Sequence, residues 1–245
     1  MVTKDIIEEV INKSIYKSHQ HLTIRNNNVK KVLNDFAHST RNRKTEKGLF
    51  ITSSGEIAFS KNGSKRSVSF TENEIKDTYK EYGELHIEHN HPDMVKNVKL
   101  PYTETLSMAD MNLLTFRTRF YDDHNGWGDY EYPFKSITAE GTNGSRMTLV
   151  RGDYFTEENH EDFDNAMKKL NKEYVNYQEL YSNTRSDFLH KISANDFDSD
   201  DEWRKQLHKE TINKIGDFED SREFKSIQKD FRNANMRLTV EWIDL

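Results

Sequence analysis

The sequence contains no cysteine, and this absence excludes two kinds of site. Disulfides cannot form, and no thiolate can bind zinc, so a transition-metal site must use histidine, aspartate or glutamate. A chain without cysteine is also compatible with a reducing compartment. Metal chemistry must therefore be sought among the histidines and the carboxylates.

A basic excess and long apolar runs are missing as well. The formal net charge is -6 at pH 7, which argues against a nucleic-acid partner because such proteins are usually basic. No apolar run approaches the roughly 18 residues that span a bilayer. The opening stretch MVTKDIIEEV carries acidic residues where a signal peptide has an apolar core. We expect a soluble, cytoplasmic protein with no membrane segment.

Hydrophobic residues are also scarce, at 33% of the 245 residues, and 14 Phe and 11 Tyr are among them. The core should therefore depend on aromatic rings. This length suits one medium domain with appendages, or two small domains.

Three regions follow one another along the chain. Residues 1–43 form an expected helical extension, with helices over 3–18 and 29–39. Residues 44–155 alternate between strand and helix patterns and predict a core of mixed α/β (α+β) class, a sheet flanked by helices. Residues 156–245 predict polar helices over 161–181 and 200–218. We expect this region either to shape the substrate groove or to bind a protein partner. The alternating stretch 236–245 predicts a strand that can rejoin the central sheet.

The central region predicts a definite order of elements. A helix over 71–83 opens with a capping box at Thr71 and Glu74 and ends at Gly83. A second helix over 106–121 has Ser107 as its N-cap. The expected strands, two of which meet around Asn143-Gly144, cover residues 48–52, 56–60, 66–70, 84–91, 130–141 and 145–152.

The strand at 84–91 carries a cluster of three histidines in ELHIEHNHPDM. Side chains two residues apart on a strand share a face, so His89 and His91 form a pair while His86 points the other way. Pro92 ends the strand. Two histidines hold a metal poorly, and a catalytic zinc usually has three protein ligands. Asp110, in the first turn of the next expected helix, is the candidate for the third.

These residues resemble a known signature. His89-Asn90-His91-Pro92 followed by Ser107-Met108-Ala109-Asp110 is similar to the motif of the JAB/MPN (JAMM) metalloproteases, closest to the RadC-like and phage-associated branch. The family also has a glutamate on an early strand, and Glu46 before Gly48-Leu49-Phe50 fits that element. Glu56 in SGEIAF is a competing choice. The resemblance covers about residues 44–152 and implies a JAB/MPN-like core.

The resemblance implies a division of roles. His89, His91 and Asp110 would bind one Zn²⁺, and Glu46 would be the general base. Ser107 would stabilise the oxyanion. The substrate would be an amide bond in a polypeptide or protein conjugate. A phage origin would place the protein in the host cytoplasm or the virion. Residues 93–106 make a longer connection than is usual in the family, which a chain tolerates at small entropic cost.

Two other functions stay open. Ser107 and Asp110 also make an ordinary capping box, so a JAB-like domain can serve as a non-catalytic binding module of phage or toxin-cassette origin. The letters EHNH also resemble an HNH-type metal-dependent nuclease, which would need later ligands such as Asn97 and His124. The acidic charge disfavours this nuclease.

Overall fold

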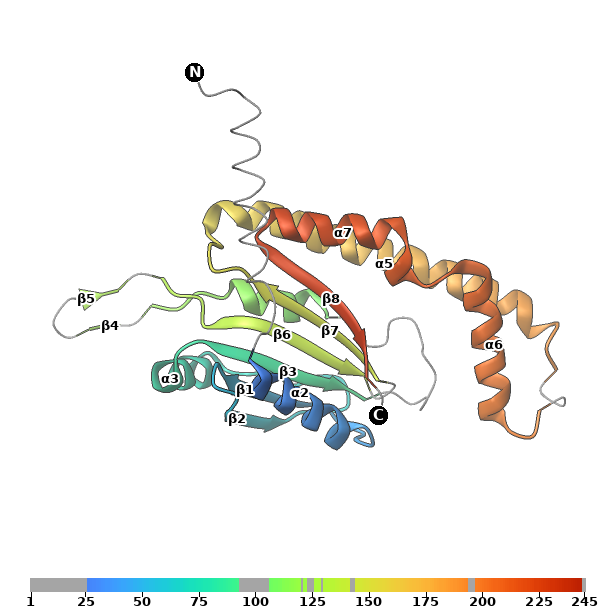
Figure 1. Cartoon of the computed structure of the whole chain (residues 1–245), viewed down its shortest axis with the longest axis horizontal. Coiled ribbons are helices and arrows are strands. Elements are labelled where there is room, and N and C mark those ends of the chain that lie inside the picture. Colours follow the sequence, from blue (N-terminus) through green and yellow to red (C-terminus); the bar gives the residue numbers. More distant parts are fainter. Residues whose placement is uncertain are drawn as a thin grey trace, which may run out of the picture.

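A six-stranded sheet forms the centre of the molecule, in the order β2-β1-β3-β6-β7-β8 (Figure 1). The computed structural model describes residues 26–92, 106–119, 121–122, 126–128, 130–141, 144–193 and 197–243. β3 and β6 run parallel, and every other neighbouring pair in this sheet is antiparallel. The strands are β1 (Lys47–Thr52), β2 (Ile57–Asn62), β3 (Leu85–His91), β6 (Phe134–Gly141), β7 (Ser145–Arg151) and β8 (Met236–Trp242).

Helices flank this sheet, which confirms the expected mixed α/β class. A separate two-stranded ribbon is made by β4 (Tyr121–Asp122) and β5 (Gly126–Trp127). The α-helices are α2 (Asn27–Thr40), α3 (Glu72–Tyr82), α4 (Met108–Asn112), α5 (His160–Leu189), α6 (Asp200–Ile215) and α7 (Arg222–Asn233). Short 3-10 turns are η1 (Leu113–Thr115), η2 (Glu157–Asn159) and η4 (Phe218–Asp220). The helix expected over 3–18 lies outside the described residues.

One face of the sheet carries the main core. Phe50, Ile87 and Ile137 point to the same side of the sheet, where Phe163 of α5 and Phe231 of α7 are also buried. Aromatic rings fill much of this layer, as the composition predicted, with Phe50 and Phe134 centred 5.4 Å apart. Because buried core residues come from β1, β3, β6, β7 and β8, a single apolar layer joins the central and C-terminal regions.

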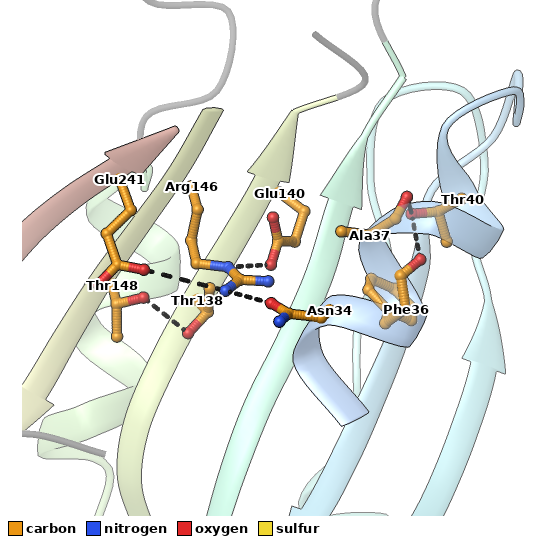
Figure 2. A network of polar contacts seen from close by, with 9 residues as sticks. All are labelled: Asn34, Phe36, Ala37, Thr40, Thr138, Glu140, Arg146, Thr148 and Glu241. Carbon is orange, nitrogen blue, oxygen red and sulfur yellow. Dashed lines mark hydrogen bonds and ion pairs between the residues drawn. The ribbon is translucent and has the colours of Figure 1, made fainter. Parts of the chain in front are cut away.

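The opposite face is apolar under α2 and polar beyond it. Leu33 and Phe36 of α2 pack against Leu49 and Ile51 of β1. Figure 2 shows Arg146 of β7 lying between Glu140 of β6 and Asn34 of α2. Arg146 is ion-paired with Glu140, and its Nη1 donates to Asn34 Oδ1 at 2.9 Å. These contacts connect α2 to β6 and β7.

Glu88 lies on the same polar face of β3 and is fully buried. Burial raises the pKa of this carboxyl well above its ordinary value, and the neighbouring Glu140 raises it further. Ionised Glu88 would add a negative charge in a buried layer beside Glu140, so burial and this neighbour favour its protonated form.

Two expected elements were wrong. Residues 66–70 form no strand, because Ser64 and Ser67 make a turn and Phe70 then packs over β1 against Phe50, with ring centres 4.3 Å apart. The helix expected over 106–121 ends far earlier, at Asn112, and continues only as η1. Thr118 instead pairs with Glu131 in an antiparallel bridge, which requires extended chain there.

The C-terminal region confirms the returning strand. β8 pairs with β7 along its whole length, from Met236 opposite Arg151 to Trp242 opposite Ser145. The predicted helices correspond to α5 and α6, whereas α7 was not predicted. Figure 1 shows the second half of α5 and all of α6 extending beyond the sheet. No helix in the described ranges is long and apolar enough to cross a membrane.

Candidate metal centre

The pair of histidines at the end of β3 is the first part of the site. β3 is a central strand between β1 and β6, and Leu85 and Ile87 bury its main-core face. His89 and His91 continue that face, and their Nε2 atoms are 3.0 Å apart. His89 is buried and His91 is half-buried. The pairing expected from strand alternation is confirmed.

His86 takes no part in the pair. Its Nδ1 lies 2.7 Å from Ser136 Oγ on β6, and the side chain is buried. The structure therefore confirms that His86 lies apart from the pair, on the other face of β3.

Asp110 reaches the histidines from the first turn of α4. Its Oδ2 accepts from Ser107 N at 2.8 Å, and Ser107 Oγ accepts from Asp110 N at 3.1 Å, which completes the capping box. The other oxygen, Oδ1, lies 3.6 Å from His89 Nε2. Burial acts to raise the pKa of Asp110, but His89 and the bonds from Ser107 outweigh it and hold that pKa well below its usual range. The carboxylate is therefore ionised and aimed at the histidine pair.

The three side chains suit a zinc ion. Among the described residues, His89, His91 and Asp110 are the one group of three candidate ligands found together, with all ligand atoms within 4.8 Å. Two atoms that share a tetrahedral Zn²⁺ at about 2.0–2.1 Å lie about 3.3 Å apart. The two separations that involve His89 Nε2, 3.0 Å to His91 and 3.6 Å to Asp110, lie on either side of that value. Two nitrogens and one oxygen also form a donor set that zinc accepts.

Glu46 lies beside these ligands, just before β1 begins. Its side chain is 7% exposed. Burial raises the pKa of Glu46, the charge of His89 and a hydrogen bond from the Val68 backbone lower it, and Asp110 raises it again, with a net upward shift. The Glu46 carboxyl thus interacts electrostatically with two of the three candidate ligands, and Gly48, two residues on, is opposite His89 in the ladder.

Glu56, the competing glutamate, is not brought to the site. It is exposed beside the β1–β2 turn, and its charge contributes to a raised pKa of Tyr82. Of the two candidates, the fold therefore brings only Glu46 to the ligands.

A glycine, Gly48, leaves space for the side chains that pack next to Glu46. Gly48 is paired with His89 across the β1–β3 ladder. A Cβ at this position would overlap the Phe70 ring, so glycine lets that ring lie directly over β1. Phe70 and Val68 thus cover the strand next to Glu46. The Gly at this spacing was noted in the sequence as part of the motif, but its packing role was not predicted.

Sequence reasoning also passed over Asn90, between the two histidines. Its side chain is 1% exposed, and its Oδ1 accepts from Lys47 N at 2.7 Å. The only available signal was its position between two candidate ligands. The connection over 93–105, and with it Asn97, lies outside the described residues, as does His124.

Comparison of the chain with protein-family models, with curated proteins and with solved structures finds no match. The resemblance to the JAB/MPN metalloproteases therefore rests on the motif residues of the sequence alone.

Proposed function

We propose that the protein is a zinc-dependent hydrolase of the JAB/MPN type that cleaves an amide bond in a polypeptide or protein conjugate. One observation carries the proposal: His89, His91 and Asp110 converge with their ligand atoms within 4.8 Å, and the buried Glu46 interacts electrostatically with His89 and Asp110. These groups come from β3, α4 and the start of β1, which are separated by long stretches of chain. Neither a non-catalytic binding module nor an HNH-type nuclease accounts for all of these groups together.

Each residue has a role in this reaction. His89, His91 and Asp110 would hold Zn²⁺, which when bound supplies a Lewis acid that activates water and polarises the scissile carbonyl. Glu46 takes the proton from the attacking water and passes it to the leaving amine. Its raised pKa suits this task, because a base works best with a pKa closer to the working pH. Ser107 is assigned as a donor to the developing oxyanion.

The alternatives differ from this proposal in what they leave unexplained. A non-catalytic module accounts for Ser107 and Asp110 through the capping box, but it assigns nothing to the ionised Oδ1 beside His89 or to Glu46. An HNH-type nuclease would place its histidines in a compact hairpin followed by a helix. β3 instead lies in the middle of the sheet, between β1 and β6.

Metal content and hydrolysis together test the proposal. Purified wild-type protein is expected to bind one equivalent of zinc, and His89→Ala and Asp110→Ala are expected to lose it. Cleavage is measured by mass spectrometry on a proteome-derived peptide library and on a matched set of lysine-ε-linked peptides. Glu46→Gln should keep its zinc and lose cleavage by about 10²–10⁴-fold. Glu56→Gln, a matched glutamate change at the residue just before β2, should keep both.

Three results would count against this reading. Equal zinc in the wild type and the two ligand variants would remove the metal site. Zinc binding without cleavage of either peptide set would favour the non-catalytic module. Loss of cleavage in Glu56→Gln, with Glu46→Gln active, would reverse the assignment of the base.

A further inference from the structure

The Asn90 side chain replaces a missing piece of the β1–β3 ladder. Paired residues run from Thr52 opposite Leu85 to Gly48 opposite His89, where the ladder ends. Beyond that point Asn90 Oδ1 accepts from Lys47 N at 2.7 Å, and Asn90 Nδ2 donates to Thr45 O at 3.4 Å. The shorter bond is the stronger of the two. A single carboxamide thus holds the chain on both sides of Glu46.

The other edge of this chain segment is held by backbone. Glu46 N donates to Ser64 O at 2.7 Å, and Gly63 N donates to Glu46 O at 2.8 Å. Glu46 therefore lies on an extended segment bonded on both edges, by the chain after β2 on one side and by Asn90 on the other. Alternation along this segment turns its side chain to the same face as Gly48, and Gly48 is opposite His89.

We propose that Asn90 is a positioning residue, whose carboxamide fixes the segment around Glu46 so that the Glu46 carboxylate is held against the His89 and Asp110 side chains. This inference rests on the proposed function. Because Asn90 lies between two candidate ligands, one short stretch of β3 positions both the two histidines that would hold the metal and the segment that carries the base. The position requires an acceptor and a donor on a short side chain, and asparagine supplies both.

The coupling between Asn90 and Glu46 can be measured without knowing the substrate. Acetohydroxamate is a suitable probe, since it chelates zinc and gives its proton to a neighbouring carboxylate. Calorimetric titration of full-length, zinc-loaded protein should show that Glu46→Gln weakens acetohydroxamate binding about tenfold. Asn90→Ala should weaken it severalfold in the wild type and not at all in the Glu46→Gln background. Such non-additivity identifies an effect that acts through Glu46.

Amide exchange reports directly on the contact itself. In Asn90→Ala the exchange of the Lys47 amide should rise at least about tenfold, while the amides of β1 from Leu49 onward stay protected. Asn62→Ala is the matched control. It makes the same substitution on β2, at an exposed side chain whose Oδ1 accepts a hydrogen bond from Arg43. It should alter neither the Lys47 amide nor probe binding. Should Asn90→Ala fail to fold, Asn90→Ser is used, since its hydroxyl is too short to reach both Thr45 and Lys47.

The outcomes separate this inference from the proposed function. Equal losses of probe affinity in both backgrounds, or unchanged Lys47 exchange in the Asn90 variants, would overturn the positioning role while leaving the hydrolase intact. A wild type that binds no zinc would overturn the proposed function. In that case the Lys47 amide still decides whether Asn90 holds the Glu46 segment.

Discussion

His86 and His89 are three residues apart on one strand, and the sheet places them in different chemical surroundings. His89 faces Asp110, whereas His86 lies on the opposite face beside Ser136. Burial, with a smaller contribution from Lys135, lowers the pKa of His86 from 6.5 to about 4. The folded protein therefore keeps His86 neutral over a range in which the unfolded chain is protonated.

We expect His86 to reduce the stability of the fold as the pH falls from about 6.5 to about 4. In this range the unfolded state binds a proton that the folded state does not, so the free energy of unfolding decreases with falling pH. The loss approaches about 3 kcal/mol at the lower end. His86→Gln removes this titration, so urea unfolding of metal-free protein should show the wild type losing stability relative to the variant across the range. A difference between the two proteins that does not change with pH would contradict the prediction.

At the scale of elements, α2 depends on a buried charge network as well as on apolar packing. Arg146 is buried, is ion-paired with Glu140, and bonds Asn34 on α2 (Figure 2). Removing one partner of a buried pair leaves the other charge without compensation, which costs more than the pair contributes.

Arg146→Ala should therefore destabilise the protein by about 3–5 kcal/mol. Arg117→Ala provides the matched control, because Arg117 is paired with the exposed Glu157 and its loss should cost about 0–1 kcal/mol. Chemical denaturation measures both values, and amide exchange in α2 should rise only in the Arg146 variant. Similar costs for the two arginines would show that the buried network contributes no more than a surface pair.

Elements with local signals were predicted correctly from the sequence. Both bonds of the Thr71 and Glu74 capping box are present, and Gly83 ends α3 with a φ of 75°. Strand alternation likewise paired His89 with His91. In each case the residues that interact are close together in the chain, so a pattern in the sequence reports on the contact directly.

Elements and contacts that depend on distant partners were missed. Residues 66–70 alternate like a strand, yet Phe70 packs on Phe50 because Gly48 leaves space for its ring. α7 was also missed, although the sequence indicates it. Ser221 is a typical N-cap, and apolar residues follow at helical spacing at Phe224, Ile227 and Phe231. The bond from Lys47 to Asn90 joins residues 43 positions apart. No local pattern reports such a contact. Asp110 could be expected near the histidines because its helix follows their strand directly, and the family resemblance implied the same ligand.

At the scale of the whole molecule, one core joins the regions that the sequence separates. Apolar residues of α5, α7 and β8 pack with those of β3, β6 and β7 in a single cluster. β8 also covers the edge of β7. The region 156–245 is thus needed to complete the sheet, because it supplies β8. The outer part of this region extends beyond the sheet. We define the helical arm as residues 178–215, which comprise the second half of α5 and all of α6 (Figure 1).

The residues that flank the helical arm, Tyr177 and Gly216, are in contact with each other. Deleting the arm therefore tests whether the sheet folds without it. Tyr177 Oη donates to Gly216 O at 2.6 Å, and the Tyr177 and Phe218 rings are 5.4 Å apart between centres. A linker of a few Gly and Ser residues can therefore connect 177 to 216 without moving either end. We expect this deletion variant to fold and to unfold cooperatively, because the main core cluster keeps its residues in α7, β8 and the first half of α5.

The fragment 44–155 is the contrasting protein for the same measurement. It lacks β8 and the helices that cover the main core face, so Ile137, Met147 and Leu149 would be exposed to water, and we expect no cooperative unfolding transition. Calorimetry and amide exchange compare the two proteins with the full chain. A fragment 44–155 that folds by itself would make the central region an independent domain. An arm deletion that fails to fold would instead place residues 178–215 among those that the sheet requires.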